Sequence, residues 1–156
     1  MSPRQDSMAL AAIAAVTLAA AGTPGCDRPS RLYRDIIDAY LASLGYEPLD
    51  CGEEQADWGT PGNQAGRQCL VDAFDDAVPA RFTSVRKSTE GEPITSDYFV
   101  EVDEGVAGVV FFLDQGRDDD AADEVWRYDC SGVYMTDGGL LSLTGCDSVQ
   151  VLTEVP

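Results

Sequence analysis

The sequence predicts an α+β fold in which two N-terminal helices pack on one face of an antiparallel sheet of about five strands. Three observations lead to this prediction. Apolar residues recur every three to four positions between residues 30 and 78, the period changes to two after Pro79, and turn-forming residues separate the later apolar stretches. Because helices come first and hairpins follow, the helices are expected to cover the same face of the sheet.

The first predicted helix runs from Ser30 to Leu44. Ser30 can cap its N-terminus, and Gly45 can take the left-handed conformation that ends a helix. The polar face lacks the Lys and Arg enrichment of helices that lie on membranes, so the apolar face is expected to pack in the core. That apolar face consists of Leu32, Tyr33, Ile36, Ile37, Tyr40, Leu41 and Leu44.

A turn-rich stretch covers residues 46–63, and a second helix is predicted from Gln64 to Val78, where Pro79 ends it. Its expected inner face is Ala65, Cys69, Leu70, Ala73, Phe74 and Ala77. Strands are then predicted at Arg81–Lys87, Ile94–Val102 and Val106–Leu113, at Glu124–Asp129 with Val133–Thr136, and at Leu140–Leu143 with Ser148–Thr153. Val106–Leu113 is the most apolar and is placed centrally, and a bulge is expected at Ser131–Gly132.

The N-terminus has the layout of a secretory signal peptide. A short polar start with Arg4 precedes the apolar residues 8–21, and Gly22-Thr23-Pro24-Gly25 lead to Cys26. This layout resembles the lipobox of bacterial lipoproteins, and with four further Cys the chain resembles small bacterial lipoproteins of unknown function. The resemblance implies that Cys26 is lipidated and anchors the protein in the cell envelope, at either the inner or the outer membrane. Residues 1–25 are then signal peptide, 26–29 a tether and 30–156 a single domain.

Ordinary cleavage after residues 19–21, which form an A-x-A-like site, is the alternative. It would leave Cys26 as an unpaired thiol. With lipid on Cys26, the other four cysteines can form two disulfides. We expect Cys51 to pair with Cys69 and Cys130 with Cys146, because each pair is adjacent in the chain and joins neighbouring elements, although four cysteines allow three pairings.

The net charge and the residue types that are present exclude several classes of function from the expectation. The chain has 28 acidic and 10 basic residues and a net charge of −18, so nucleic acid is not an expected partner. It has no His and no CxxC spacing, so Ser/His and Cys/His nucleophiles and structural zinc are not expected. A Ser/Lys pair of Lys87 with Ser84 or Ser88 has poor geometry on a strand. We therefore predict a protein that is not an enzyme and needs no cofactor.

Two local features offer recognition chemistry. Residues 114–124 are rich in Asp, and Asp118, Asp119, Asp120 and Asp123 could supply oxygen ligands to calcium, although the spacing does not match an EF-hand. Trp58 lies in the turn-rich stretch, where it could pack on a disulfide or anchor a partner, and Trp126 and Tyr128 share one strand face.

The sequence therefore favours a non-enzymatic, acidic lipoprotein that binds an unknown protein, peptide or cell-wall ligand. The alternative is a calcium-dependent surface protein that uses the 114–124 loop. A secreted inhibitor with helices on a sheet is a third hypothesis, for which the sequence shows no inhibitory motif.

Overall fold

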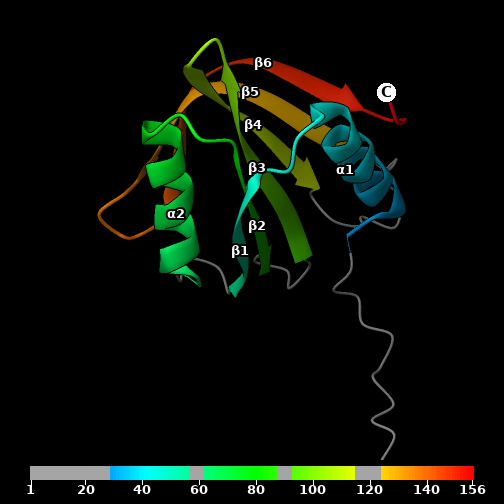
Figure 1. Cartoon of the computed structure of the whole chain (residues 1–156). Helices are drawn as coiled ribbons and strands as arrows, with labels where there is room; N and C mark the ends of the chain where they lie inside the picture. Colours follow the sequence, from blue (N-terminus) through cyan, green and yellow to red (C-terminus); the bar gives the residue numbers. More distant parts are fainter. Residues whose placement is uncertain (1–28, 57–61, 88–92, 115–123) are drawn as a thin grey trace, which may run out of the picture.

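One sheet separates the two helices that the described residues form (Figure 1). The computed structural model describes residues 29–56, 62–87, 93–114 and 124–156. Within these residues the elements are α1 (Arg31–Leu44), β1 (Leu49–Ala56), α2 (Gln64–Asp75), β2 (Ala80–Lys87), β3 (Pro93–Asp103), β4 (Val106–Asp114), β5 (Val125–Met135) and β6 (Leu141–Leu152). The six strands lie in the order in which they occur in the chain.

The predicted fold class is wrong in four respects, of which three concern the order, number and pairing of the elements. The helices are not both N-terminal to the sheet, because β1 lies between them; the sheet of the described residues has six strands; and β1 pairs parallel with β2, so the sheet is mixed. The turn-rich sequence of residues 46–63 concealed β1. A parallel neighbour requires a crossover connection, and α2 is that connection.

The helices also cover opposite faces of the sheet, not one face. Phe99 and Val100 are adjacent in β3, so their side chains point to opposite sides. Phe99 packs with α1 in a cluster that includes Val110 and Phe112, whereas Val100 packs with α2 in a cluster that includes Phe82. We call the side of Phe99 the α1 face and the side of Val100 the α2 face.

Helix α1 forms as predicted. The Ser30 hydroxyl accepts a hydrogen bond from the Tyr33 backbone N–H, and Gly45 takes a left-handed conformation with φ 70°. Tyr33, Ile36 and Ile37 are fully buried against the α1 face. The Ser30 backbone N–H is bound by the Asp114 carboxylate, which joins the start of the helix to β4.

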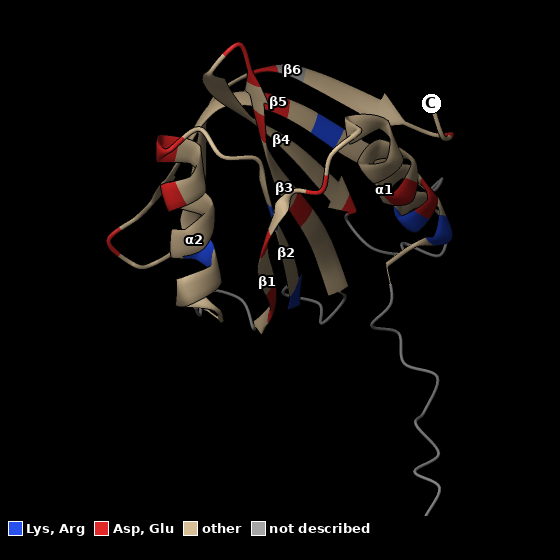
Figure 2. Cartoon of the chain, in the orientation of Figure 1, with Lys and Arg blue, Asp and Glu red and all other residues tan. Residues whose placement is uncertain are grey.

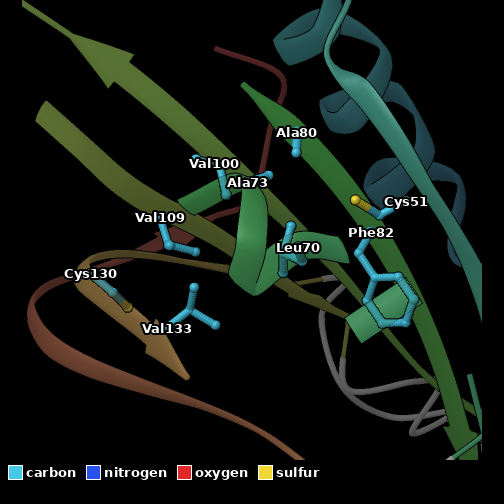
Figure 3. Close-up of a cluster of buried hydrophobic side chains, with 9 residues drawn as sticks. All are labelled: Cys51, Leu70, Ala73, Ala80, Phe82, Val100, Val109, Cys130 and Val133. Atoms are coloured by element: carbon cyan, nitrogen blue, oxygen red, sulfur yellow. The ribbon is translucent and has the colours of Figure 1, made fainter. Parts of the chain in front are cut away.

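Helix α2 is attached to β1 by the Cys51–Cys69 disulfide and covers a core cluster with Leu70 and Ala73 at its centre (Figure 3). Gly66 makes this close approach feasible, because a Cβ there would lie 2.6 Å from the Cys51 carbonyl oxygen. The helix ends at Asp75, before the predicted Val78. Ala65 is exposed rather than on the inner face, and Gly66 and Arg67 are buried there instead.

The strands from β2 to β4 match the predicted ranges to within one residue at each end. β5 and β6 are each continuous, and a register shift lies between Asp129 and Cys130, one residue before the predicted bulge. Cys130 and Cys146 face each other across this pair and form the second predicted disulfide. Among the described residues, no helix has the length and apolar character needed to span a membrane.

Candidate functional site

Of the three buried carboxylates among the described residues, Glu54 and Asp97 each organise a polar cluster, one on each face of the sheet, and Asp114 is the third. Asp97 in β3 points to the α1 face and Glu54 in β1 points to the α2 face. Burying a carboxylate is costly unless partners surround it, so each carboxylate lies at the centre of a hydrogen-bonded cluster. The two clusters have similar chemistry, but their access to solvent differs.

The Asp97 cluster consists of Asp97, Arg81, Thr83 and Tyr33. Arg81 donates from Nε at 2.9 Å and from Nη2 at 2.8 Å to Asp97 Oδ1, which also accepts from the Thr83 hydroxyl at 2.6 Å. Asp97 Oδ2 accepts from the Tyr33 hydroxyl at 2.9 Å. The carboxylate therefore links α1 to β2 and β3, while the Arg81 side chain remains 31% exposed.

The Glu54 cluster consists of Glu54, Arg67, Ser84, Arg86 and Asn63. Arg67 binds both carboxylate oxygens, with Nε 2.9 Å from Oε2 and Nη2 2.5 Å from Oε1. Ser84 and Arg86 donate to Oε1, and the Asn63 backbone N–H donates to Oε2. Arg67 Nη1 donates to the Gly139 carbonyl at 2.6 Å, and the Arg67 side chain is 0% exposed. Glu54 and Arg67 are therefore sealed beneath α2, whereas the Arg86 side chain is 25% exposed.

Two adjoining cavities lie on the α1 face, where α1 leaves part of β1 and β2 uncovered. One, of about 340 Å³, lies between α1 and strands β1, β2 and β3 and contains the Asp97 cluster. The other, of about 560 Å³, lies at the C-terminal end of α1 beside Tyr46 and Pro48. Arg81 lines both, so we treat them as one groove, the α1 groove. Each volume is in the range of small-molecule sites.

The charge of the α1 groove is predominantly negative. Its charged lining consists of Asp38, Glu47, Asp50, Glu53, Asp97, Arg34 and Arg81. Asp97 already neutralises Arg81, and Asp38 and Glu53 are exposed on opposite walls, in α1 and β1. A cationic group that enters the groove would meet carboxylates on both sides, whereas Arg81 offers a single oriented donor at the floor.

Tyr33, Tyr40 and Glu54 have shifted pKa values, which indicate their protonation states at neutral pH. Burial raises the pKa of Tyr33 well above its usual value, and the Asp97 carboxylate raises it further. Burial likewise raises the pKa of Tyr40, whose hydroxyl donates to Glu101. Burial also raises the pKa of Glu54, but donors from Arg67, Asn63 and Ser84 outweigh it and hold the pKa below the usual range. The Tyr33 hydroxyl is therefore protonated at neutral pH and donates a hydrogen bond to Asp97.

Several predicted site residues lie outside the described residues: Cys26, Trp58, Ser88, and the four aspartates Asp118, Asp119, Asp120 and Asp123. Asp114, at the start of the acidic loop, is buried and accepts from the Ser30 backbone. In the described part of the chain, no three His, Cys, Asp or Glu side chains are grouped in a way that could hold a metal ion.

The remaining candidates are placed as follows. Ser84 is buried and donates to Glu54, while Lys87 is exposed, so these two do not form a catalytic pair. Trp126 and Tyr128 share the α2 face, as predicted, with ring centroids 6.4 Å apart. Tyr128 packs against the α2 core cluster.

Sequence reasoning missed Arg67, Glu54 and Asp97. A signal for Arg67 existed, because it lies three residues before Leu70 and therefore on the same helix face. A signal for burial on both faces existed as well, because Phe99 and Val100 are adjacent apolar residues within a strand. Searches for similar family models, curated proteins and solved structures find no match.

Proposed function

We propose that the chain is a non-enzymatic binding module of the bacterial cell envelope, anchored through lipid on Cys26, and that the α1 groove is its ligand site. The observation that carries the proposal is the position of Arg81. Asp97 orients its guanidinium at the junction of two cavities, while carboxylates line both walls. Oriented donors in a concave site are typical of ligand recognition.

The ligand class follows from this lining. Carboxylates of Asp38 and Glu53 attract ammonium or guanidinium groups, and Arg81 can donate to a carboxylate or carbonyl of the same ligand. The net charge of −18 favours the approach of cations to the whole domain. A short basic peptide with a free C-terminal carboxylate supplies both kinds of group. We therefore propose such a peptide as the ligand.

The test is an NMR titration of the exported domain with trilysine, trialanine and C-terminally amidated trilysine. Trilysine is expected to shift signals of residues that line the α1 groove, trialanine to shift none, and amidation to weaken binding by removing the partner of Arg81. The double variant Asp38→Asn, Glu53→Gln should bind trilysine about tenfold more weakly.

The matched control is Asp72→Asn, Asp75→Asn, which changes the net charge equally but on the exposed surface of α2. If the control weakens trilysine binding as much as the groove variant, the peptide responds only to the diffuse negative charge and the proposed site is wrong. The same holds if the shifted signals are spread over the whole surface.

The anchor is tested separately by the intact mass of the membrane-extracted protein. Lipidation predicts an N-terminus at Cys26 with added acyl mass. An unmodified N-terminus at Gly22 would instead indicate ordinary cleavage after Ala21, and the protein would then be secreted without an anchor.

A further inference from the structure

The two edges of the sheet differ in how they are protected. An unpaired edge strand invites pairing with another chain, and proteins usually block it with charge, bulges or short length. β1, at one edge, has eight residues, carries Asp50, Glu53 and Glu54, has a register shift between Asp50 and Glu53, and is joined to α2 by a disulfide. This edge carries several of these protective features.

β6, at the other edge, has less charge protection than β1. It has twelve residues, Asp147 is its single charged residue, and it contains no Lys or Pro. Figure 2 shows its arrow almost entirely tan, in a molecule where acidic residues are widespread. Its register shift with β5 lies at Asp147, between Cys146 and Ser148, and the residues from Val149 to Leu152 pair regularly with β5.

On the α2 face, the C-terminal half of β6 presents exposed apolar side chains. Val149 is 51% and Val151 is 47% exposed, and both lie on the α2 face beside their β5 neighbours Tyr128 and Trp126. In the described residues β6 pairs with β5 alone, so its outer backbone edge has no strand partner. The valines extend the half-buried aromatic surface of β5 to the rim of the sheet.

We infer that β6 pairs antiparallel with β6 of a second copy of this chain, with the two-fold axis at Gln150. In this register Val149 lies opposite Val151 of the second copy, and Val151 opposite its Val149. Asp147 lies opposite Thr153, so no two charges face each other. Apolar β-branched cross-strand pairs are favourable, and a two-fold axis produces the contact twice. The result is one continuous sheet of two protomers.

Charge decides between a second copy and another partner. A basic partner would gain nothing from the neutral β6 edge and would be attracted instead to the acidic surface elsewhere. Two copies that each carry −18 repel one another, and the β6 edge is a place where they can approach with few charges opposed. Pairing of two copies should therefore become stronger as salt screens the repulsion, whereas binding of a basic partner should become weaker.

The test is sedimentation equilibrium of the exported protein in density-matched detergent at low and high sodium chloride. A monomer–dimer equilibrium with a dissociation constant that falls as salt rises is expected. Val151→Lys should raise that constant by about tenfold or more, because each copy gains a like charge at the shared edge. Val106→Lys is the matched control, since Val106 is exposed at the β3–β4 turn, and it should leave the constant unchanged.

A thermal melt of each variant shows whether the fold is retained. The inference is wrong if the wild-type protein is monomeric at every concentration and salt, or if Val151→Lys dimerises as the wild type does. It is also wrong if association requires an added basic protein and weakens with salt. None of these outcomes depends on the α1 groove or its peptide.

Discussion

The two faces of the sheet bury similar charged clusters, but the two clusters have different roles. On the α2 face, Glu54 and Arg67 are sealed beneath a helix that a disulfide holds to β1. On the α1 face, Asp97 and Arg81 lie at the floor of a groove, and no disulfide joins α1 to the described part of the sheet. The first cluster fixes the α2 crossover, and the second orients a donor toward solvent.

Burial alone therefore does not identify a functional charge. Both carboxylates are buried and have multiple donors, and Asp97 is paired with an arginine that lines both cavities of the α1 groove. α1 is held to the sheet by hydrogen bonds from the Tyr33 and Tyr40 hydroxyls and by its apolar face. α2 is held by a covalent bond as well.

The largest effect is expected from Arg67→Met. It leaves the Glu54 carboxylate buried without its main partner, which should reduce the free energy of unfolding by about 3–5 kcal/mol. Arg81→Met on the other face should cost about 1–2 kcal/mol, because that side chain is partly exposed and water screens the Asp97 charge. Urea unfolding of both variants measures the difference. Equal losses in the free energy of unfolding would mean that the two clusters contribute equally to stability, against this prediction.

The next effect concerns the covalent link on the α2 face. Cys51→Ala with Cys69→Ala opens a loop whose ends are 18 residues apart, and should destabilise the domain by about 3 kcal/mol. Hydrogen exchange should show loss of protection in α2 and β1 before α1. The double variant Cys130→Ala, Cys146→Ala, with a separation of 16, is the comparison, and its effect should centre on β5 and β6. If protection is instead lost first in α1, then removal of the Cys51–Cys69 disulfide does not make α2 the more weakly attached helix, and this prediction is wrong.

The smallest effects concern the pH dependence of the free energy of unfolding. Glu54 on the α2 face should affect the acid limb of this pH profile, and Tyr33 on the α1 face should affect the alkaline limb. The folded pKa of Glu54 lies below its unfolded value of about 4.3, so its stabilisation is present above that pH and is lost as pH falls through the folded value. The folded pKa of Tyr33 lies above its unfolded value of about 10, so its stabilisation is complete below that pH and is lost as pH rises through the folded value.

Urea midpoints from acid to alkaline pH for the wild type, Glu54→Gln and Tyr33→Phe measure these limbs. Glu54→Gln should flatten the acid limb alone. Tyr33→Phe should flatten the alkaline limb alone and cost about 1–2 kcal/mol at neutral pH, where one hydrogen bond to Asp97 is lost. An acid limb that is unchanged in Glu54→Gln would show that general protonation of the many other carboxylates governs acid unfolding.

Local sequence determined much of this protein. The Ser30 cap, the Gly45 terminus and the spacing of Tyr33, Ile36 and Ile37 predicted α1, because capping and helical period act within a few residues. The alternation after Pro79 predicted β2, β3 and β4 for the same reason. Adjacency in the chain also predicted both disulfides, Cys51–Cys69 and Cys130–Cys146.

The way in which these elements combine does not follow from the local sequence. β1 contains Gly52 and three acidic residues and has weak local preference for a strand, so its identity depends on β2, a parallel partner that follows α2 in the chain. The opposite placement of the helices, the Glu54–Arg67 and Asp97–Arg81 pairs and the α1 groove depend on contacts between distant segments. Such contacts form through packing and charge pairing across the sheet, which the period of a sequence does not encode.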